Sequence, residues 1–283
     1  MDTNSLYRLG VCFALAVFLL VLLELSLRFF SKTPSLRQNE IARNPARSLV
    51  HAADVVATLL IAATVAGTLD GDSAKSDLLH AALHGVVAEV LFLVCSRAQV
   101  RFFLASKLGG EIDRGNVAAG TAAAGHSLAT GILATTAIGS ETLREVGISL
   151  VFFVLGQVAL LGIVALFRML TVYADADEIL GENIAAGISY TGVMVAVALL
   201  VSRATEGTFT TWSESLSGFA QVLAYAPLLY CVRQFVVGSV VLGNRPTLRG
   251  GPLDRGIAER SVGLAALEAA TYLGAALIVV RLP

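Results

Sequence analysis

The chain has 283 residues, of which 56% are hydrophobic and only 14% are charged, and its formal net charge is −1. Soluble globular domains carry roughly 45–50% apolar and about 25% charged residues, and one soluble core cannot hide so large an apolar excess. The composition excludes a soluble enzyme, a disordered chain and a disulfide-rich secreted domain, and without a basic excess we expect no nucleic-acid partner. It predicts an all-α, polytopic membrane protein whose partner is the lipid bilayer.

Eight stretches are long and apolar enough to cross a bilayer, which takes about 20 residues of helix. In chain order they are Leu6–Phe30, Leu49–Leu69, Leu78–Ser96, Val117–Ile138, Val146–Met169, Asn183–Val201, Phe219–Leu242 and Gly263–Val280. The first is too long for a signal-peptide core and lacks a small-residue cleavage site, so we expect it to remain as an anchor. All three cysteines lie in apolar stretches, where they are expected to pack as small apolar side chains.

The positions of lysine and arginine predict the orientation of these spans, because cytoplasmic loops are enriched in both. On one side fall Arg28, Lys32, Arg37, Arg43, Arg47, Arg97, Arg101, Lys107, Arg114, Arg168, Arg233, Arg245, Arg249, Arg255 and Arg260. The other side holds only Arg8, Lys75, Arg144, Arg203 and Arg281, together with an acidic loop that contains Asp70, Asp72 and Asp77. Both termini are therefore predicted to lie outside the cytoplasm.

A segment near the cytoplasmic side repeats along the chain. Residues 111–125 read EIDRGNVAAGTAAAG and residues 178–192 read EILGENIAAGISYTG, with seven of the fifteen positions identical. Two degenerate copies of the segment begin at Glu40 and Pro252. Their motif asparagine is lost, since Pro45 or its neighbour Asn44 stands near that place in one copy and Ile257 in the other. The pattern predicts four helical hairpins as parallel repeats, grouped in two four-helix halves, residues 1–140 and 141–283.

The Glu-Ile-x-x-x-Asn-(Val/Ile)-Ala-Ala-Gly signature at the start of a span resembles that of the domain of unknown function 350, the family of YjfL-type bacterial inner-membrane proteins. Smaller members of that family carry two such hairpins in four spans, so this chain resembles a double-length member. The resemblance covers about Leu78 to Val201 well and the outer hairpins weakly. It implies a multi-pass protein of the bacterial inner membrane. By association with neighbouring genes, it also implies a role in envelope stress with a cytosolic partner.

Asn116 and Asn183 are the most specific polar residues of the repeat. Each stands at the cytoplasmic start of a span, where asparagine is a favoured N-cap; the alternative is that these helix starts form an anion or lipid-headgroup site. Small residues follow at spacings of about four, including Gly120, Ala124 and Gly131 in one span and Gly187, Gly192 and Ala196 in the other. Such stripes let helices approach closely, so spans 4 and 6 are predicted to lie centrally and to touch other helices.

Ionisable residues inside the spans carry a free-energy cost in the bilayer and usually face the bundle interior. Asp54, Glu89, His126 and Glu268, with His84 beyond them, are the candidates for a proton or cation path. The alternative is that the buried carboxyl groups tie helices together through hydrogen bonds, with Gln157, Tyr190, Tyr225, Tyr230 and Tyr272 available as partners. Arg233 lies deep in span 7, and Glu268 on the next span is its expected partner.

His80 and His84 lie at i and i+4 on one helix face, a spacing that can hold a metal ion. His84 and His126 are the pair that a haem would need on facing helices. No HExxH pattern accompanies them, so they remain weak metal candidates and no cofactor is expected.

Three functions therefore stay open, and none is that of a soluble catalyst. The first is conduction of protons, cations or a small solute through a polar bundle interior. The second is a non-catalytic membrane scaffold that presents basic turns to a cytosolic stress-response partner or to anionic lipids. The third is an intramembrane metal or haem redox protein. The sequence leaves open whether the chain works alone or as a homo-oligomer.

Overall fold

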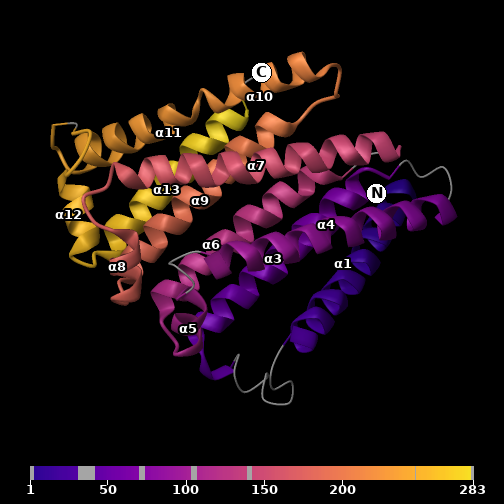
Figure 1. Ribbon diagram of the computed structural model, residues 1–283, viewed down its shortest axis with the longest axis horizontal. Coiled ribbons are helices and arrows are strands. Elements are labelled where there is room, and N and C mark those ends of the chain that lie inside the picture. The colour runs from indigo at the N-terminus through magenta and orange to yellow at the C-terminus, as the bar shows by residue number, and fades with distance from the viewer. Residues whose placement is uncertain are drawn as a thin grey trace.

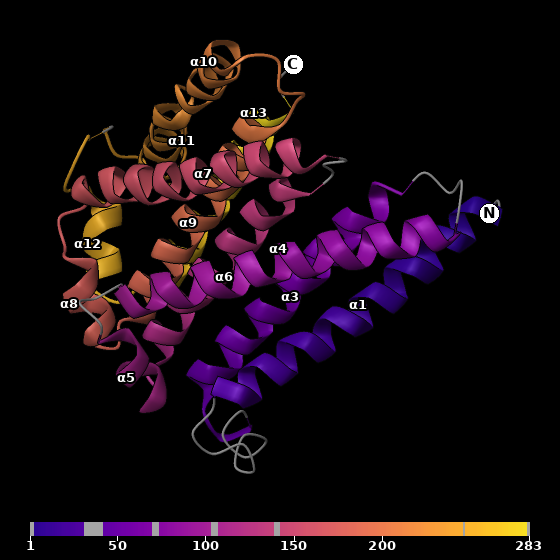
Figure 2. The same ribbon diagram turned by 45° about the vertical axis from the view of Figure 1, so that its right-hand side comes forward.

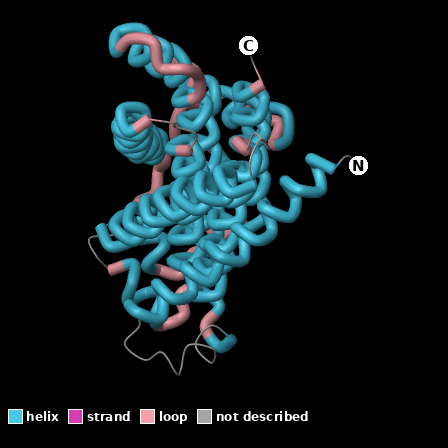
Figure 3. Tube along the Cα trace, turned by 90° about the vertical axis from the view of Figure 1, so that its right-hand side faces the viewer, coloured by secondary structure: helices cyan, strands magenta, loops and turns pink. Residues whose placement is uncertain are grey.

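The computed structural model describes residues 3–30, 42–69, 74–102, 107–138, 142–245 and 247–281. This part of the chain contains helices and loops and no strand (Figure 3). Eight helical segments in it are long and apolar enough to cross a membrane: Leu6–Phe29, Pro45–Gly67, Ser76–Arg101, Val117–Ala137, Arg144–Met169, Ile184–Thr205, Trp212–Val241 and Val262–Val280. The prediction of an all-helical chain with eight candidate spans is confirmed. Lys32, Arg37, Glu40, Asp70 and Asp72, which entered the charge and repeat arguments, lie outside the described residues.

Seven of these segments are built on single long helices. They are α1 (Thr3–Phe30), α3 (Pro45–Gly67), α4 (Ala74–Phe102), α6 (Val117–Ala134, continued by the 3₁₀ turn Thr135–Ala137), α7 (Leu143–Met169), α9 (Ile184–Thr205) and α13 (Val262–Val280). Three short helices precede α6, α9 and α13 in the chain, namely α5 (Leu108–Asp113), α8 (Asp175–Leu180) and α12 (Pro252–Ala258). Figures 1 and 2 show these three short helices along one edge of the bundle, away from both termini.

The seventh span differs from the continuous helix expected over Phe219–Leu242. It consists of α10 (Trp212–Leu223), α11 (Ala226–Arg233) and a π-helical segment, η4 (Gln234–Val241). Pro227 stands in the first turn of α11, and a proline has no N–H for the preceding turn and clashes with the carbonyl four residues earlier. The helix therefore breaks at Ala224 and Tyr225 and restarts with the proline in the position that tolerates it.

Four helices form the core of the bundle as a row in the order α3, α6, α9 and α13, each packed along the next. Glycines permit each contact. A Cβ on Gly120 would lie 2.5 Å from Ala46 Cα, one on Gly187 would lie 2.8 Å from the Ala118 carbonyl oxygen, and one on Gly192 would lie 2.4 Å from Ala269 Cβ. Because no real Cβ fits at such distances, the three interfaces depend on glycine in the same way.

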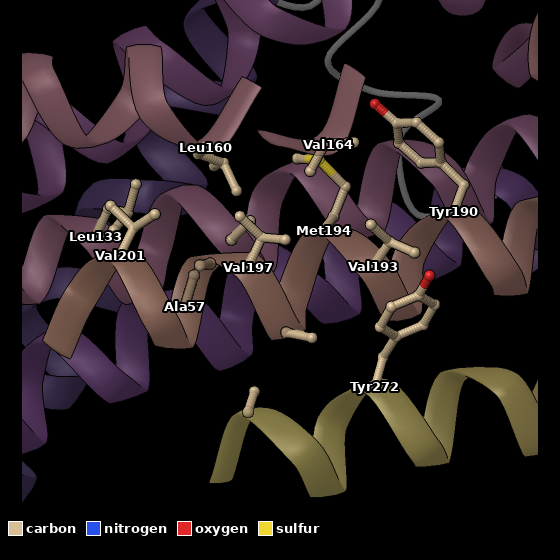
Figure 4. Close-up of a cluster of buried hydrophobic side chains, with 14 of the residues drawn as sticks. Ala57, Leu133, Leu160, Val164, Tyr190, Val193, Met194, Val197, Val201 and Tyr272 are labelled. Atoms are coloured by element: carbon tan, nitrogen blue, oxygen red, sulfur yellow. The ribbon is translucent and has the colours of Figure 1, made fainter. Parts of the chain in front are cut away.

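The row explains why spans 4 and 6 are the most buried. In the most apolar stretches of α6 and α9, 78% and 72% of residues are buried, against at most 44% in any other span. The prediction that these two spans lie centrally and touch other helices is therefore confirmed. Figure 4 shows the apolar side chains of α9, including Val193, Met194 and Val197, with the Met194 side chain directed toward Val164 of α7. The remaining long helices cover the row and expose apolar side chains outward, as lipid contact requires.

Candidate functional site

Asparagine side chains hydrogen-bond the starts of three central helices to neighbouring short helices. Asn44, Asn116 and Asn183 are the N-caps of α3, α6 and α9, and each accepts a backbone N–H of its own first turn. The Nδ2 group of each donates to a backbone carbonyl in the next short helix along the chain. The acceptors are Ile112, Ile179 and Ile257, at 2.8, 2.9 and 2.9 Å.

This recurring bond corrects the expectation that the first copy has lost its asparagine, because Asn44 performs the same two tasks as Asn116 and Asn183. The prediction that Asn116 and Asn183 are helix caps is confirmed. The fourth helix, α13, starts at Ser261, which has no amide donor. The bonds also place the starts of α3, α6 and α9 at the same end of the molecule as α5, α8 and α12.

Glu111 shares the amide of Asn116, whose Nδ2 donates to Glu111 Oε2 at 2.8 Å, and Glu178 receives the same bond from Asn183. This hydrogen bond, helped by Arg114 at 2.7 Å, holds the pKa of Glu111 below its ordinary value of 4.5. The glutamate of the motif therefore orients the capping asparagine. Because both asparagine groups are occupied within the protein, we assign these residues to holding the central helices to the short helices α8 and α12 rather than to an anion site.

A first acid cluster lies between α3 and α4 and contains Asp54, Thr58, Glu89 and Arg97. Arg97 Nη2 donates to Asp54 Oδ2 at 2.7 Å, and the Thr58 hydroxyl donates to Glu89 Oε1 at 2.9 Å. Glu89 is 0% exposed and Asp54 is 1% exposed. Among the described residues, Asp54 Oδ1 and Glu89 Oε2 find no hydrogen-bond partner. The cluster thus contains two carboxyl groups and one guanidinium.

A second acid cluster lies between α11, α12 and α13 and contains Arg233, Asp254 and Glu268, each 1% exposed. The expected pair of Arg233 with Glu268 is confirmed, with Arg233 Nε 2.7 Å from Glu268 Oε1. Arg233 Nη2 also donates to Asp254 Oδ1 at 2.6 Å, and the Gly250 N–H donates to Asp254 Oδ2 at 3.0 Å. Glu268 Oε2 has no hydrogen-bond partner within the described chain. Here too, two carboxyl groups share one guanidinium.

A neutral polar network lies between α4, α6, α7 and α9. His126 Nδ1 donates to Gln99 Oε1 at 2.9 Å, and the Tyr190 hydroxyl donates to His126 Nε2 at 3.2 Å. Gln99 Nε2 donates in turn to Gln157 at 2.6 Å and to Thr130 at 3.1 Å. Both imidazole nitrogens are thus hydrogen-bonded while the ring is neutral. His126 therefore links neighbouring helices through hydrogen bonds.

A third charged group forms where α7 ends. Arg168 Nε donates to Asp175 Oδ2 at 2.6 Å, and its two Nη atoms donate to the Ser189 and Tyr173 hydroxyls, each at 2.9 Å. Burial raises the pKa of Tyr173, so its hydroxyl stays neutral. This group balances its own charge with one arginine and one aspartate.

One polar residue on each helix of the central row lies at a similar depth. Asp54 and His126 lie ten residues after the N-caps of α3 and α6, while Tyr190 and Glu268 lie seven residues after those of α9 and α13. At 1.5 Å per residue this is about 10–15 Å from the end that carries the short helices. Glu89 lies deeper, because its partner Thr58 is fourteen residues after the α3 N-cap.

The remaining candidates lie on α4. The rings of His80 and His84 stack with centroids 3.9 Å apart, and His84 Nδ1 hydrogen-bonds to the His80 carbonyl at 3.0 Å. Within the part of the chain that the structure describes, no three His, Cys, Asp or Glu side chains are placed to hold a metal ion.

Several residues of these clusters were not singled out as site residues from the sequence. Arg97 was counted only as a cytoplasmic charge, Asp254 lies in a lead segment with no apolar signal, and Gln99 and Thr58 are common types in spans. The one available signal was that each buried carboxyl group needs a donor, which could have directed attention to the arginines near the ends of α4 and α11.

The family model described as Domain of Unknown Function (DUF350) matches residues 1–138 and again residues 141–282. Each matched region contains one of the two acid clusters. No curated protein and no solved structure matches the chain.

Proposed function

The chain belongs to the DUF350 family, with two copies of the domain, and we propose that each copy holds one proton on a buried glutamate and that the protein conducts protons across its membrane. The observation that carries the proposal is the charge of the acid clusters. Each contains two buried carboxyl groups and a single arginine, so each is one positive charge short of neutrality.

An uncompensated charge in the apolar interior costs several kcal/mol, and a proton removes it. Asp254 accepts hydrogen bonds at both oxygens and Asp54 is paired with Arg97. In the second cluster Glu268 Oε2 is the acid oxygen with no partner among the described residues. In the first, Asp54 Oδ1 and Glu89 Oε2 both lack one, but the donor to Glu89 is the neutral Thr58 hydroxyl, whereas the donor to Asp54 is an arginine. The proton is therefore assigned to Glu89 in the first cluster and to Glu268 in the second.

A proton fits these sites better than a metal cation. A hard cation needs about six oxygen ligands around it, whereas a proton needs one acceptor atom. Among the described residues, no three His, Cys, Asp or Glu side chains are placed to supply such ligands together. Carboxyl groups that exchange protons inside a bundle are the usual elements of proton relays in membranes.

His126 and Tyr190 of the neutral network lie on α6 and α9, which stand in the row between α3 with Asp54 and α13 with Glu268. In the proposal the network fixes the relative positions of the helices that carry the clusters. It offers hydroxyl and imidazole groups beside the sites, while the glutamates bind and release the proton.

We also propose the topology that this function requires. The chain forms four helical hairpins as parallel repeats in the bacterial inner membrane, with the end that carries α5, α8 and α12 in the cytoplasm. Lys107, Arg114, Arg249, Arg255 and Arg260 belong to that end, in keeping with the positive-inside rule. Both termini then lie outside, which labelling of a cysteine introduced at Thr208 with a membrane-impermeant maleimide in intact cells tests. A homo-oligomer and a cytosolic partner remain compatible with this topology.

Flux measurements in liposomes test the proposed conduction. Purified protein is reconstituted with a pH-sensitive dye inside, and a pH jump is applied under a valinomycin-clamped potential. We expect proton entry in the wild type, reduced entry in Glu89→Gln and in Glu268→Gln, and none in the double variant. Glu24→Gln is the matched control, because this carboxyl group lies half-exposed in α1 and pairs with His51 outside both clusters.

The scaffold alternative predicts a different result. If the wild type, shown to be folded by its elution and thermal transition, lets in no more protons than empty liposomes, the conduction proposal is wrong. Retention of a cytosolic protein by the basic end of the molecule would then favour the scaffold.

A further inference from the structure

A cleft of about 920 Å³ opens at the other end of the bundle, away from the short helices. Its lining comes from the end of α6, the first turns of α7, the end of α9 with the loop that follows it, and one face of α10. Both α7 and α10 pack on α9, which contributes its last residues, Arg203 to Thr205, to the lining. The volume is in the range of sites that enclose a small molecule.

The deeper wall of the cleft is apolar and aromatic. Phe152 of α7 and Phe219 of α10 line it, and their rings meet edge to face with centroids 6.1 Å apart. Trp212 stacks on Phe152 at 6.2 Å and meets Phe209 at 5.0 Å. No residue of α10 is buried, although the helix is amphipathic and its apolar face carries Phe219 and Val222. This face therefore has room for an apolar chain beside it, at the level of the spans.

The mouth of the cleft carries charges of both signs where the spans end. Arg144 and Arg203 contribute two cations, and Glu145, Glu206 and Glu214 contribute three anions. Arg203 and Glu206 are 3.3 Å apart, while Glu145 belongs to the capping box of α7 with Thr142. A purely anionic or purely cationic ligand would meet repulsion from one of the two sets of charges. A zwitterion can satisfy both sets.

We propose that this cleft binds one zwitterionic aminophospholipid. Its phosphate lies near Arg144 and Arg203, its primary ammonium group lies near Glu206 and Glu214, and one acyl chain lies along Phe152 and Phe219. A primary ammonium donates three hydrogen bonds to carboxylate oxygens, which a quaternary ammonium cannot do. This site is separate from the acid clusters and goes beyond the proposed proton conduction.

The fluorescence of Trp212 tests the site, because this is the one tryptophan in the sequence and its ring touches the lining. The probe is phosphatidylethanolamine with a brominated acyl chain, added to nanodiscs of unbrominated lipid. Phosphatidylcholine and phosphatidylglycerol with the same chain serve as headgroup comparisons at equal mole fraction. We expect the strongest quenching from phosphatidylethanolamine.

Two exposed substitutions then test the recognition of the headgroup. Arg144→Gln and Glu214→Gln should each weaken the preference for phosphatidylethanolamine by about threefold, since such partly exposed pairings are modest. Arg281→Gln, a cation at the same end outside the lining, should leave the preference unchanged. Equal quenching by all three lipids, or stronger quenching by phosphatidylglycerol, would overturn the proposal. Unchanged selectivity in both cleft variants would overturn it as well, and their elution profiles show whether they are folded.

Discussion

Arg233 and Glu268 meet in the interior with Nε 2.7 Å from Oε1, and both side chains are 1% exposed. Because Asp254 also accepts from Arg233 at 2.6 Å, the arginine has two acidic partners and remains paired when either is neutralised. The same count of two acids and one arginine recurs in the first acid cluster with Asp54, Glu89 and Arg97. This charge imbalance in each half is the physical basis of the proposed proton binding.

Substitutions in the second acid cluster should therefore lower the free energy of unfolding by unequal amounts. We expect Glu268→Gln or Asp254→Asn alone to lower the free energy of unfolding by less than about 1.5 kcal/mol, since a neutral ion pair remains. The double variant, or Arg233→Met, leaves buried charge unpaired and should cost about 3–5 kcal/mol. Unfolding in mixed micelles of a denaturing detergent measures the differences. A single Glu268→Gln as costly as the double variant would show that the glutamate carries the full negative charge.

The stability contributed by the Nδ2 donor of Asn116 can be measured separately from that of its capping oxygen Oδ1. Asn116→Ser keeps an N-cap acceptor but removes the bonds from Nδ2 to the Ile179 carbonyl and to Glu111 Oε2, while the Ile179 oxygen keeps its bond from the Glu182 N–H. We expect a loss of about 0.5–1.5 kcal/mol, the net contribution of a hydrogen bond whose acceptor keeps another donor. Asn116→Ala also removes the cap and should cost about 1 kcal/mol more. Equal stability of the serine variant and the wild type, measured in the same detergent titration, would show that the bond to the Ile179 carbonyl contributes nothing.

Glycines in the central row should be sensitive to the smallest side chain. Gly120→Ala would bring a Cβ to 2.5 Å from Ala46 Cα, and Gly192→Ala would bring one to 2.4 Å from Ala269 Cβ. Both should lower the thermal midpoint, because backbone atoms on both sides must shift. Gly162→Ala, in α7, meets nothing within 4 Å and is the matched control. A common midpoint for all three variants would contradict the packing of the row.

Stability should fall in acid partly through Glu111. Its pKa is held below 4.5 by the Asn116 amide and then by Arg114. A lowered native pKa contributes stability that is present above 4.5 and is lost as the pH falls through the native value. The thermal midpoint of the wild type should therefore drop more steeply below pH 4.5 than that of Glu111→Gln. Parallel pH profiles for the two proteins would count against this contribution.

Much of the fold could be predicted from the sequence because lipid imposes a simple rule. A helix that spans the bilayer must be apolar over its length, which made all eight segments visible. The small residues of spans 4 and 6 indicated their central place for a similar reason, since only glycine allows backbones to approach so closely. The break in span 7 was missed because its hydropathy is continuous and only Pro227 marks the boundary.

The candidate site was only partly predictable, since partners far apart in the chain leave no local pattern. Glu268 and Arg233 were paired because both are charges inside spans on neighbouring helices. Asp254 stands in the short helix α12, outside the apolar spans, so nothing local distinguishes it from a solvated acid. Asn44 was noted near the motif position but was not identified as the motif asparagine, because the surrounding sequence is degenerate; it makes the same bond as Asn116.

The most direct measurement is infrared absorption by protonated carboxyl groups in the purified protein at neutral pH, compared between the wild type and the variants. We expect a protonated-carboxyl band in the wild type that weakens in Glu89→Gln and in Glu268→Gln and vanishes in the double variant. No such band in the wild type, or a band that survives in the double variant, would contradict the claim that each half holds one proton on a buried glutamate.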